Sequence, residues 1–346
     1  MHTSPQRLQT PDEGPPPVIR NKPLSPSQGS ARYPKKPRVL ACVSRTPEAD
    51  AVAAQSIAVA HSLGLEVTFA SVIEQAVHSA VPADPIEWQL NWEKQHAQLQ
   101  DLKHRNEGSA KTSSVVLVGE PSEELIDWGE ENGASLLAFS TGTPSNGKGM
   151  GLTTLRILQS GATSLLLVPP QAEVSVQRYR RILVPVDGSA RAESVLPIAK
   201  RIARTHDAEL ILVHVIPEAT RPEGFEVRAL GNLQIEFERE KQQTARAHLE
   251  QLRSRTEEES LSLRSLLLGP ADPRTATCQL ASDLSVDLVV MSSHGATALS
   301  DVPCGSVAEY LATHCSMPVL MVRPNLVTDF DAGLFDTNGQ SVFRFG

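Results

Sequence analysis

The chain has 346 residues, of which 40% are hydrophobic and only 4% aromatic, and its formal net charge is -8. That length accommodates two ordinary domains, and an aliphatic composition suits parallel α/β sheets. The acidic balance argues against a nucleic-acid partner, because nucleic-acid-binding proteins normally present a basic face. No apolar run approaches the ~20 residues that a membrane-spanning helix needs, so no membrane span is expected.

The cysteines indicate a reducing compartment. They form no CxxC pair, and no signal peptide is recognisable ahead of them, so we expect reduced thiols and a cytoplasmic location. They also lack histidines at the spacing of a nucleophile pair or a metal site. No catalytic residue and no metal ligand is therefore predicted among Cys42, Cys278, Cys304 and Cys315.

The two ends of the chain differ in character from the rest. Residues 1–36 contain the run Pro15-Pro16-Pro17, scattered Arg and Lys, and no hydrophobic period, which predicts a disordered tail. Residues 326–346 also lack a clear period and are expected to form a loosely held tail.

Between the tails the chain contains an internal duplication. A first domain at residues 37–170 and a second at 180–325 are joined by a linker at 171–179. The first two predicted strands recur after a constant offset of 143 positions, and the fourth and fifth also have counterparts. The matched pairs are Val39–Ser44 with Ile182–Asp187, Val67–Ile73 with Leu210–Ile216, Leu136–Ser140 with Leu288–Ser292, and Leu165–Pro169 with Val319–Arg323.

Each copy alternates strands with amphipathic helices, which predicts an α/β domain with a five-stranded parallel sheet covered on both faces. In the second copy the first helix is expected after Ser189, a good N-cap residue. With the strand order 3-2-1-4-5, the first and fourth strands flank the point where the winding reverses. Asp187 and the turn from Ser292 to Gly295 then meet at the mouth of one crevice, where ligands of such sheets bind.

The second copy also contains two glycine turns suited to phosphate. Ser292-Ser293-His294-Gly295 follows a short apolar strand, and Gly305-Ser306 comes nine residues later and opens a helix. Glycine lets backbone N–H groups approach an anion, and the start of a helix offers unpaired amides at the positive end of its dipole. We expect Ser306 to cap that helix, and His214 and His294 to be structural residues with satisfied hydrogen bonds.

These motifs resemble those of the universal stress protein family in its tandem form. The resemblance is strongest in the second half and fainter over Pro37–Pro170. It implies that both domains are Rossmann-like, of the adenine nucleotide alpha hydrolase-like type. The ATP-binding branch of the family has Gly, two residues, Gly, nine residues, Gly and then Ser or Thr, whereas this chain has Ser292 at the first position. The residues that carry the resemblance are Arg181–Ser189, Glu209–Pro217, Ser293-His294-Gly295 and Gly305-Ser306-Val307.

By this resemblance, the second domain binds ATP, or AMP or ADP, together with Mg. Asp187 is expected to bind the ribose hydroxyls, the backbone of Val215 to meet the adenine edge, and Pro185 to lie beside the base. The phosphates are expected to lie against the backbone and small side chains of Ser292, Gly295, Gly305, Ser306 and Val307.

The first domain departs from this pattern. Ser44 stands where Asp187 does, Cys42 where Pro185 does, and Leu152 where Ser306 does. It therefore lacks the ribose acid and the phosphate-facing serine, and we expect one competent site per chain.

The sequence thus favours a nucleotide-binding regulator of the stress response, with slow ATP hydrolysis as the most enzymatic activity expected. The alternative is a tandem module that binds no nucleotide and acts through protein–protein contacts. Apolar edge strands are usually covered, so we expect Leu165–Val168 and Val319–Val322 to join the two domains as an intramolecular pseudo-dimer, with a further homodimer left open.

Overall fold

The computed structural model describes most of the two expected domains. Residues 1–35, and with them nearly all of the predicted N-terminal tail, lie outside the described residues. The described ranges are 36–44, 48–74, 84–106, 108, 110–141, 152–161, 163–174, 178–218, 231–257, 261–295 and 304–331.

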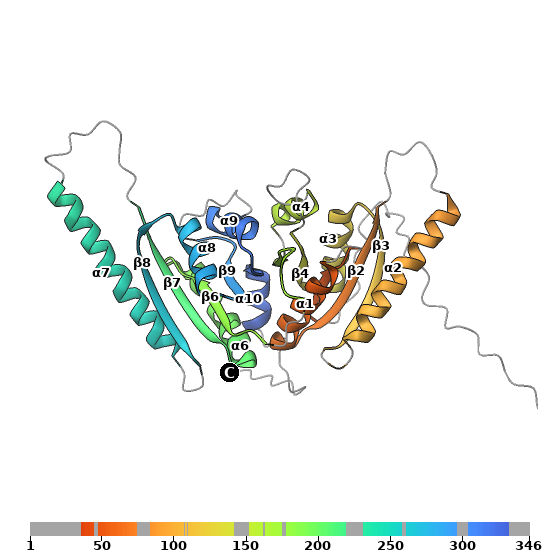
Figure 1. Ribbon diagram of the computed structural model, residues 1–346, viewed down its shortest axis with the longest axis horizontal. Coiled ribbons are helices and arrows are strands. Elements are labelled where there is room, and N and C mark those ends of the chain that lie inside the picture. Colours follow the sequence, from red (N-terminus) through yellow and green to blue (C-terminus); the bar gives the residue numbers. More distant parts are fainter. Residues whose placement is uncertain are drawn as a thin grey trace, which may run out of the picture.

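Within the described residues, ten strands form a single sheet (Figure 1). The order is β3-β2-β1-β4-β5-β10-β9-β6-β7-β8, so each half has the expected order 3-2-1-4-5. The first half contributes β1 (Arg38–Cys42), β2 (Glu66–Glu74), β3 (Thr112–Gly119), β4 (Ala134–Ser140) and β5 (Ser164–Val168). The second contributes β6 (Arg181–Pro185), β7 (Glu209–Pro217), β8 (Leu263–Ala271), β9 (Leu288–Ser292) and β10 (Val319–Val322).

The two halves join through their last strands. β5 and β10 pair antiparallel, with Leu166 opposite Leu320 at the centre of the register, whereas the neighbouring pairs within each half are parallel. Every residue of both strands is buried. Each apolar edge is thus covered by the other, which confirms the expected intramolecular pairing of the two copies.

Helices cover both faces of the sheet and enclose two apolar cores. One core lies under α1, α2, α6, α7 and α10, and the other under α3, α4, α8 and α9. Both cores continue across the junction of the halves. The helices are α1 (Ala49–Leu63), α2 (Pro85–Arg105), α3 (Pro121–Asn132), α4 (Leu152–Ser160), α5 (Ala190–Glu193), α6 (Leu196–His206), α7 (Gly231–Thr256), α8 (Pro273–Asp283), α9 (Ser306–His314) and α10 (Pro324–Asp331).

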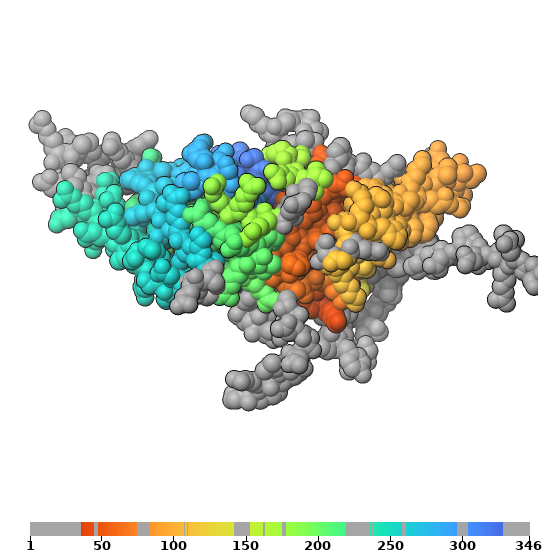
Figure 2. Space-filling view, turned by 60° about the horizontal axis from the view of Figure 1, so that its bottom comes forward, coloured from red at the N-terminus to blue at the C-terminus, as the bar shows by residue number. Residues whose placement is uncertain are grey.

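The duplication is visible in the first helices of the two halves. β1 and β6, like β2 and β7, begin and end 143 positions apart, and the left-handed C-caps of α1 and α6, Gly64 and Asp207, keep the same offset. These two helices pack against each other at the centre of the molecule. In Figure 2 the red segment of the first half accordingly lies against the green segment of the second.

The chain after β10 fastens the second half to the first. Buried Arg323 donates from Nη2 to the Leu158 carbonyl at 2.7 Å and from Nη1 to the Thr163 carbonyl at 3.0 Å. Asn325 accepts from the Ser164 hydroxyl at 2.9 Å. The expected C-terminal tail is therefore not loose at its start: α10 extends through Asp331, because Leu326 is completely buried in the core.

Candidate functional site

A cavity of about 430 Å³ opens where β6 and β9 lie side by side in the second half. The winding of the sheet reverses between these strands, which is where ligands of doubly wound folds bind. All eight residues predicted to contact nucleotide line this cavity: Pro185, Asp187, Val215, Ser292, Gly295, Gly305, Ser306 and Val307.

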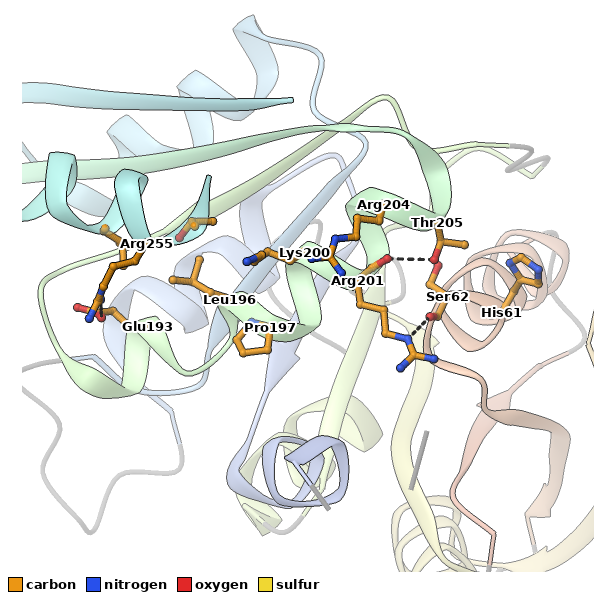
Figure 3. Close-up of a pocket in the computed structure, with 12 residues that line it drawn as sticks. His61, Ser62, Glu193, Leu196, Pro197, Lys200, Arg201, Arg204, Thr205 and Arg255 are labelled. Carbon is orange, nitrogen blue, oxygen red and sulfur yellow. Dashed lines mark hydrogen bonds and ion pairs between the residues drawn. The ribbon is translucent and has the colours of Figure 1, made fainter. Parts of the chain in front are cut away.

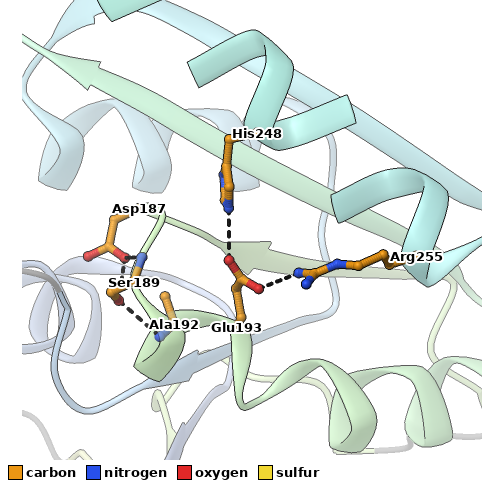
Figure 4. A network of polar contacts seen from close by, with 6 residues as sticks. All are labelled: Asp187, Ser189, Ala192, Glu193, His248 and Arg255. Atoms are coloured by element: carbon orange, nitrogen blue, oxygen red, sulfur yellow. Dashed lines mark hydrogen bonds and ion pairs between the residues drawn. The ribbon is translucent and has the colours of Figure 1, made fainter. Parts of the chain in front are cut away.

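Asp187 follows β6 and is held by the turn that starts α5. Its Oδ1 accepts from the Ser189 amide at 3.0 Å and from the Ser189 hydroxyl at 2.6 Å. The Ser189 hydroxyl oxygen in turn accepts from the Ala192 amide at 3.1 Å, as expected for the N-cap (Figure 4). Gly188 between them has a φ of 83°, a conformation that glycine adopts without steric cost. The helix cap therefore orients the carboxylate at the cavity.

The second carboxylate oxygen of Asp187 lies directly against Gly295. A Cβ atom built on Gly295 would overlap Asp187 Oδ2, so the glycine is what permits the first glycine turn to approach the carboxylate this closely. The two motifs that the sequence separates by more than 100 positions thus form one wall of the cavity.

The two glycine turns are tied together by backbone hydrogen bonds. Gly305 donates to the Ser293 carbonyl at 2.8 Å, and Ser293 donates to the Val322 carbonyl at 3.1 Å. The Ser292 hydroxyl donates to the His294 carbonyl at 2.5 Å, so the serine at the family's glycine position stabilises the turn. Residues 296–303 between the turns lie outside the described residues.

The prediction that Ser306 caps α9 is wrong. Gly305 is the N-cap and makes no side-chain capping bond, and Ser306 is the first helical residue. Gly305 has an extended backbone, with φ -73° and ψ 154°, and its amide is bonded to the Ser293 carbonyl. The helix therefore begins at Ser306, one residue earlier than it would if Ser306 were the cap. The first amides of α9 accordingly have no intrahelical acceptors and no side-chain cap.

Part of the cavity lining is apolar. Pro185 ends β6, Met291 lies in β9, and Val215 lies near the end of β7 with only 8% of its surface exposed. The ladder between β7 and β8 shifts register between Val215 and Pro217, at the point where the strand reaches the cavity. This part of the lining has the apolar character that a flat aromatic ring requires.

His214 does not have the satisfied hydrogen bonds that the sequence analysis expects. Its Nδ1 atom is buried and has no hydrogen-bond partner within the described residues, although the side chain lines the cavity. Burial, followed by the proximity of His248, lowers its pKa, while Asp187 opposes that shift. His294, by contrast, shares a 2.9 Å hydrogen bond with the Ser293 hydroxyl.

Arg274 is a cavity residue that the sequence analysis missed. It lies in the first turn of α8, and its Nη2 atom forms a 2.7 Å ion pair with Asp272, the N-cap of that helix. Its guanidinium carbon lies 5.9 Å from the centre of the Tyr310 ring. The loop between the glycines contributes no cation in the sequence, so Arg274 adds a positive charge at the rim from a third element.

The equivalent position in the first half differs as expected. The Ser44 carbonyl accepts from Gln98 at 3.2 Å, and burial raises the pKa of Cys42 to about 12. The glycine-rich stretch 142–151 lies outside the described residues, so the degeneracy of this copy stays a prediction.

The described part of the chain contains neither a cluster of metal-ligating side chains nor a helix fit to cross a membrane. No three His, Cys, Asp or Glu side chains gather there as metal ligands would. In the same part of the chain, no helix combines the length and apolar character that crossing a membrane requires.

The fold and the cavity define a tandem α/β protein with a ligand-sized crevice at the switch point of its second half. The universal stress protein family model matches residues 37–169 and 178–323. The chain belongs to the universal stress protein family.

Relatives with known names match over one domain's length. A universal stress protein of Methanocaldococcus jannaschii is 30% identical over 155 residues, which cover 42% of this chain and 95% of the relative. One from Thermus aquaticus is 28% identical over 148 residues, covering 42% of this chain and 99% of the relative.

A solved structure supports the fold of the whole chain. A universal stress protein from Archaeoglobus fulgidus covers 84% of this chain and 99% of its own, with a TM-score of 0.57 and 16% identity.

Proposed function

We propose that this protein is a regulatory protein that binds an adenine nucleotide in the cavity of its second half. The observation that carries the proposal is the contact of Asp187 with Gly295 inside a cavity that all eight predicted residues line. The cavity thus offers a carboxylate for the ribose, a pair of glycine turns for the phosphates and apolar side chains for the base.

The size and chemistry of the cavity support a ligand of this class. Its volume of about 430 Å³ lies within the roughly 300–1,000 Å³ of typical small-molecule sites. Among the described residues, the first amides of α9 have no side-chain cap, and with the positive end of the helix dipole they suit phosphate. Arg274, which is paired with Asp272, brings a guanidinium to the same lining. The buried Nδ1 of His214 lacks a partner within the described residues, and a bound polar group would satisfy it.

The family includes a member whose solved structure is a complex with cAMP. For this chain we propose ATP, ADP or AMP, with Mg accompanying the phosphates when more than one is present. A cytoplasmic location is part of the proposal, and the free thiols of Cys42, Cys278, Cys304 and Cys315 support it. Assembly into a homodimer stays open, and no catalytic residue is assigned.

The test is calorimetric titration of the full chain with AMP, which carries a single phosphate, together with mass spectrometry of any nucleotide that the denatured protein releases. We expect about one site per chain, because Ser44 and Leu152 replace the ribose acid and the phosphate-facing serine in the first half. Two sites would contradict the degeneracy of the first half. No binding and no released nucleotide would favour the alternative, a module that acts through protein–protein contacts.

A further inference from the structure

A second cavity, of about 770 Å³, lies on the sheet face covered by α1, α6 and α7. It is distinct from the crevice described above and involves both halves of the chain. We name it the junction pocket. Its lining residues are His61, Ser62, Glu193, Leu196, Pro197, Lys200, Arg201, Arg204, Thr205, Leu252, Arg255 and Thr256.

The junction pocket is strongly basic in a protein that is acidic as a whole. Its described lining contains one lysine and three arginines, Lys200, Arg201, Arg204 and Arg255, against one carboxylate. Figure 3 shows α6 between two groups of lining residues, with Arg255 on one side and His61 on the other. A cleft lined by charges of one sign concentrates the field and attracts ions of the opposite sign.

The one carboxylate of the described lining, Glu193, is already engaged elsewhere. It accepts from Arg255 at 2.5 Å and from His248 at 2.8 Å (Figure 4). Burial opposes ionisation of Glu193, but these hydrogen bonds outweigh it and lower its pKa. Glu193 is thus held by two side chains of α7, one of which is the Arg255 of the pocket lining.

The cations of α6 are placed against one another. Lys200 and Arg204 are four residues apart and therefore neighbours on the helix surface, where like charges repel. Burial lowers the pKa of Lys200, and the charge of Arg204 lowers it further. Arg201, on the adjacent row, donates from Nε to the Ser62 carbonyl of the first half at 3.0 Å, which holds its guanidinium at the pocket.

The equivalent helix of the first half does not carry the same cations. With the offset of 143 positions that strands and caps obey, Lys200 and Arg201 correspond to Ile57 and Ala58, and Arg204 to His61. Ile57 and Ala58 are buried in the core, so the same fold is built with apolar residues at these positions. The cationic side chains of α6 thus replace apolar ones of α1 at two positions, while His61, at the third, lies in the same pocket.

We propose that the junction pocket binds a small molecule that carries two or more phosphate groups. Arginine and lysine side chains on several elements are the groups that recognise such anions. The volume favours a small molecule over a macromolecule, and buried Leu196 and Leu252 give the pocket an apolar floor for a non-phosphate part. The binding site lies between the halves, so its occupant contacts both. This proposal does not depend on the nucleotide site.

The first experiment is titration of the full chain with inorganic tripolyphosphate, which contains phosphate groups only. Lys200→Ala combined with Arg204→Ala should weaken binding by roughly tenfold or more, because two charge-assisted contacts are lost. Arg191→Ala removes an exposed arginine of α5 that lines neither cavity, and it should leave the affinity unchanged. Gly305→Val, a variant of the nucleotide cavity, should also leave it unchanged.

A variant with the opposite sign separates binding from structural damage. Glu193→Gln removes the carboxylate of the described lining, so it should strengthen tripolyphosphate binding, and a variant that merely perturbed the fold would weaken it.

Three results would overturn the proposal. One is the absence of saturable tripolyphosphate binding, and another is equal loss in the Arg191→Ala control. The third is binding of an acidic peptide such as polyglutamate by a protein that does not bind tripolyphosphate, provided that the α6 variants abolish the peptide binding. The α6 variants should still bind adenosine, which carries no phosphate. This result would show that the nucleotide cavity is intact and that the loss is confined to the junction pocket.

Discussion

Asp187 and Gly295 come together so closely that a side chain on the glycine would occupy the place of the carboxylate. A Cβ atom at Gly295 would overlap Asp187 Oδ2, whereas Oδ1 is held by Ser189. When position 295 carries a methyl group, either the carboxylate must rotate away from its bonds with Ser189 or the glycine turn must move.

Gly295→Ala should therefore weaken ATP, AMP and adenosine to a similar degree, by roughly 1–3 kcal/mol, the range for a lost charge-assisted hydrogen bond. Asp187→Asn should have the same effect, since the amide oxygen can still accept from Ser189 but the charge is gone. Titration with the three ligands measures both. The control is Gly269→Ala, where a Cβ atom would meet nothing within 4 Å. Unchanged affinity in Gly295→Ala would mean that the carboxylate does not contact the ligand.

Gly305 allows the opposite end of the ligand to be tested separately. A Cβ atom there would meet the Ser293 carbonyl at 3.5 Å, an ordinary contact, and the φ of -73° suits any residue. Gly305→Val should therefore fold, but its branched side chain should obstruct approach to the first amides of α9. We expect ATP to bind much more weakly and adenosine nearly as before. Equal losses for both, with native circular dichroism, would show that this turn does not bind phosphate.

Much of the fold could be predicted because the information is local or repeated. Strand and helix periods, together with the constant offset of 143 positions, indicate two α/β copies, and the switch-point rule brings Asp187 and Gly295 to one crevice. Arg274 escaped prediction because it reaches the cavity from the first turn of α8. Its proximity depends on how three elements pack, and no motif marks it.

The junction pocket could not be predicted for a related reason. Lys200 and Arg204 read in the sequence as a solvated helix face, and only the packing of α6 against α1 and near α7 turns that face into a cavity. Ser306 is predicted as the cap of α9 because serine is a common N-cap residue. In the structure the helix begins one residue earlier, after Gly305, whose amide is bonded to the Ser293 carbonyl.

The pairing of β5 with β10 predicts that the halves remain together when the chain is cut. Fragments 1–174 and 175–346, expressed together, should co-purify, because the strand pairing and the contacts of Arg323 and Asn325 cross the cut.

Arg323→Met in the intact chain should lower the free energy of unfolding by about 2–4 kcal/mol, because the carbonyls of Leu158 and Thr163 lose a charged donor. An unchanged denaturation midpoint for Arg323→Met would contradict this expectation. Two fragments that sediment as separate folded monomers would contradict the expected co-purification.

His206 predicts how stability depends on pH. Its Nδ1 accepts a hydrogen bond from the Tyr179 amide at 3.2 Å, which only the neutral ring can do. Burial lowers the pKa of His206; the backbone contact with Ala58 opposes this, and the charges of His61 and Arg178 add to it. Nearby, the Tyr179 hydroxyl donates to Gln55 of the first half at 2.8 Å, so protonation of the ring strains a contact between the halves.

The sign of the effect follows from the lowered pKa. Below the unfolded-state pKa, about 6.5 for histidine, the unfolded chain binds a proton that the folded chain does not, so the free energy of unfolding falls as the pH falls. Above that pH the contribution is fully present. One such proton changes the free energy of unfolding by at most about 1.4 kcal/mol per pH unit. His214, whose pKa is also lowered, acts in the same direction.

His206→Asn isolates the contribution of His206, because asparagine offers the Tyr179 amide an acceptor oxygen but takes up no proton. Urea denaturation of both proteins at pH 7.5, 6.5 and 5.5 measures the difference. The wild-type protein should lose more stability than the variant between pH 6.5 and 5.5. Between pH 7.5 and 6.5 the two should change nearly in parallel, because the histidine of the unfolded chain has only begun to take up its proton. Parallel loss across the whole range would show that His206 titrates alike in the folded and unfolded states, and the neutral ring would then not be what joins Tyr179 to α6.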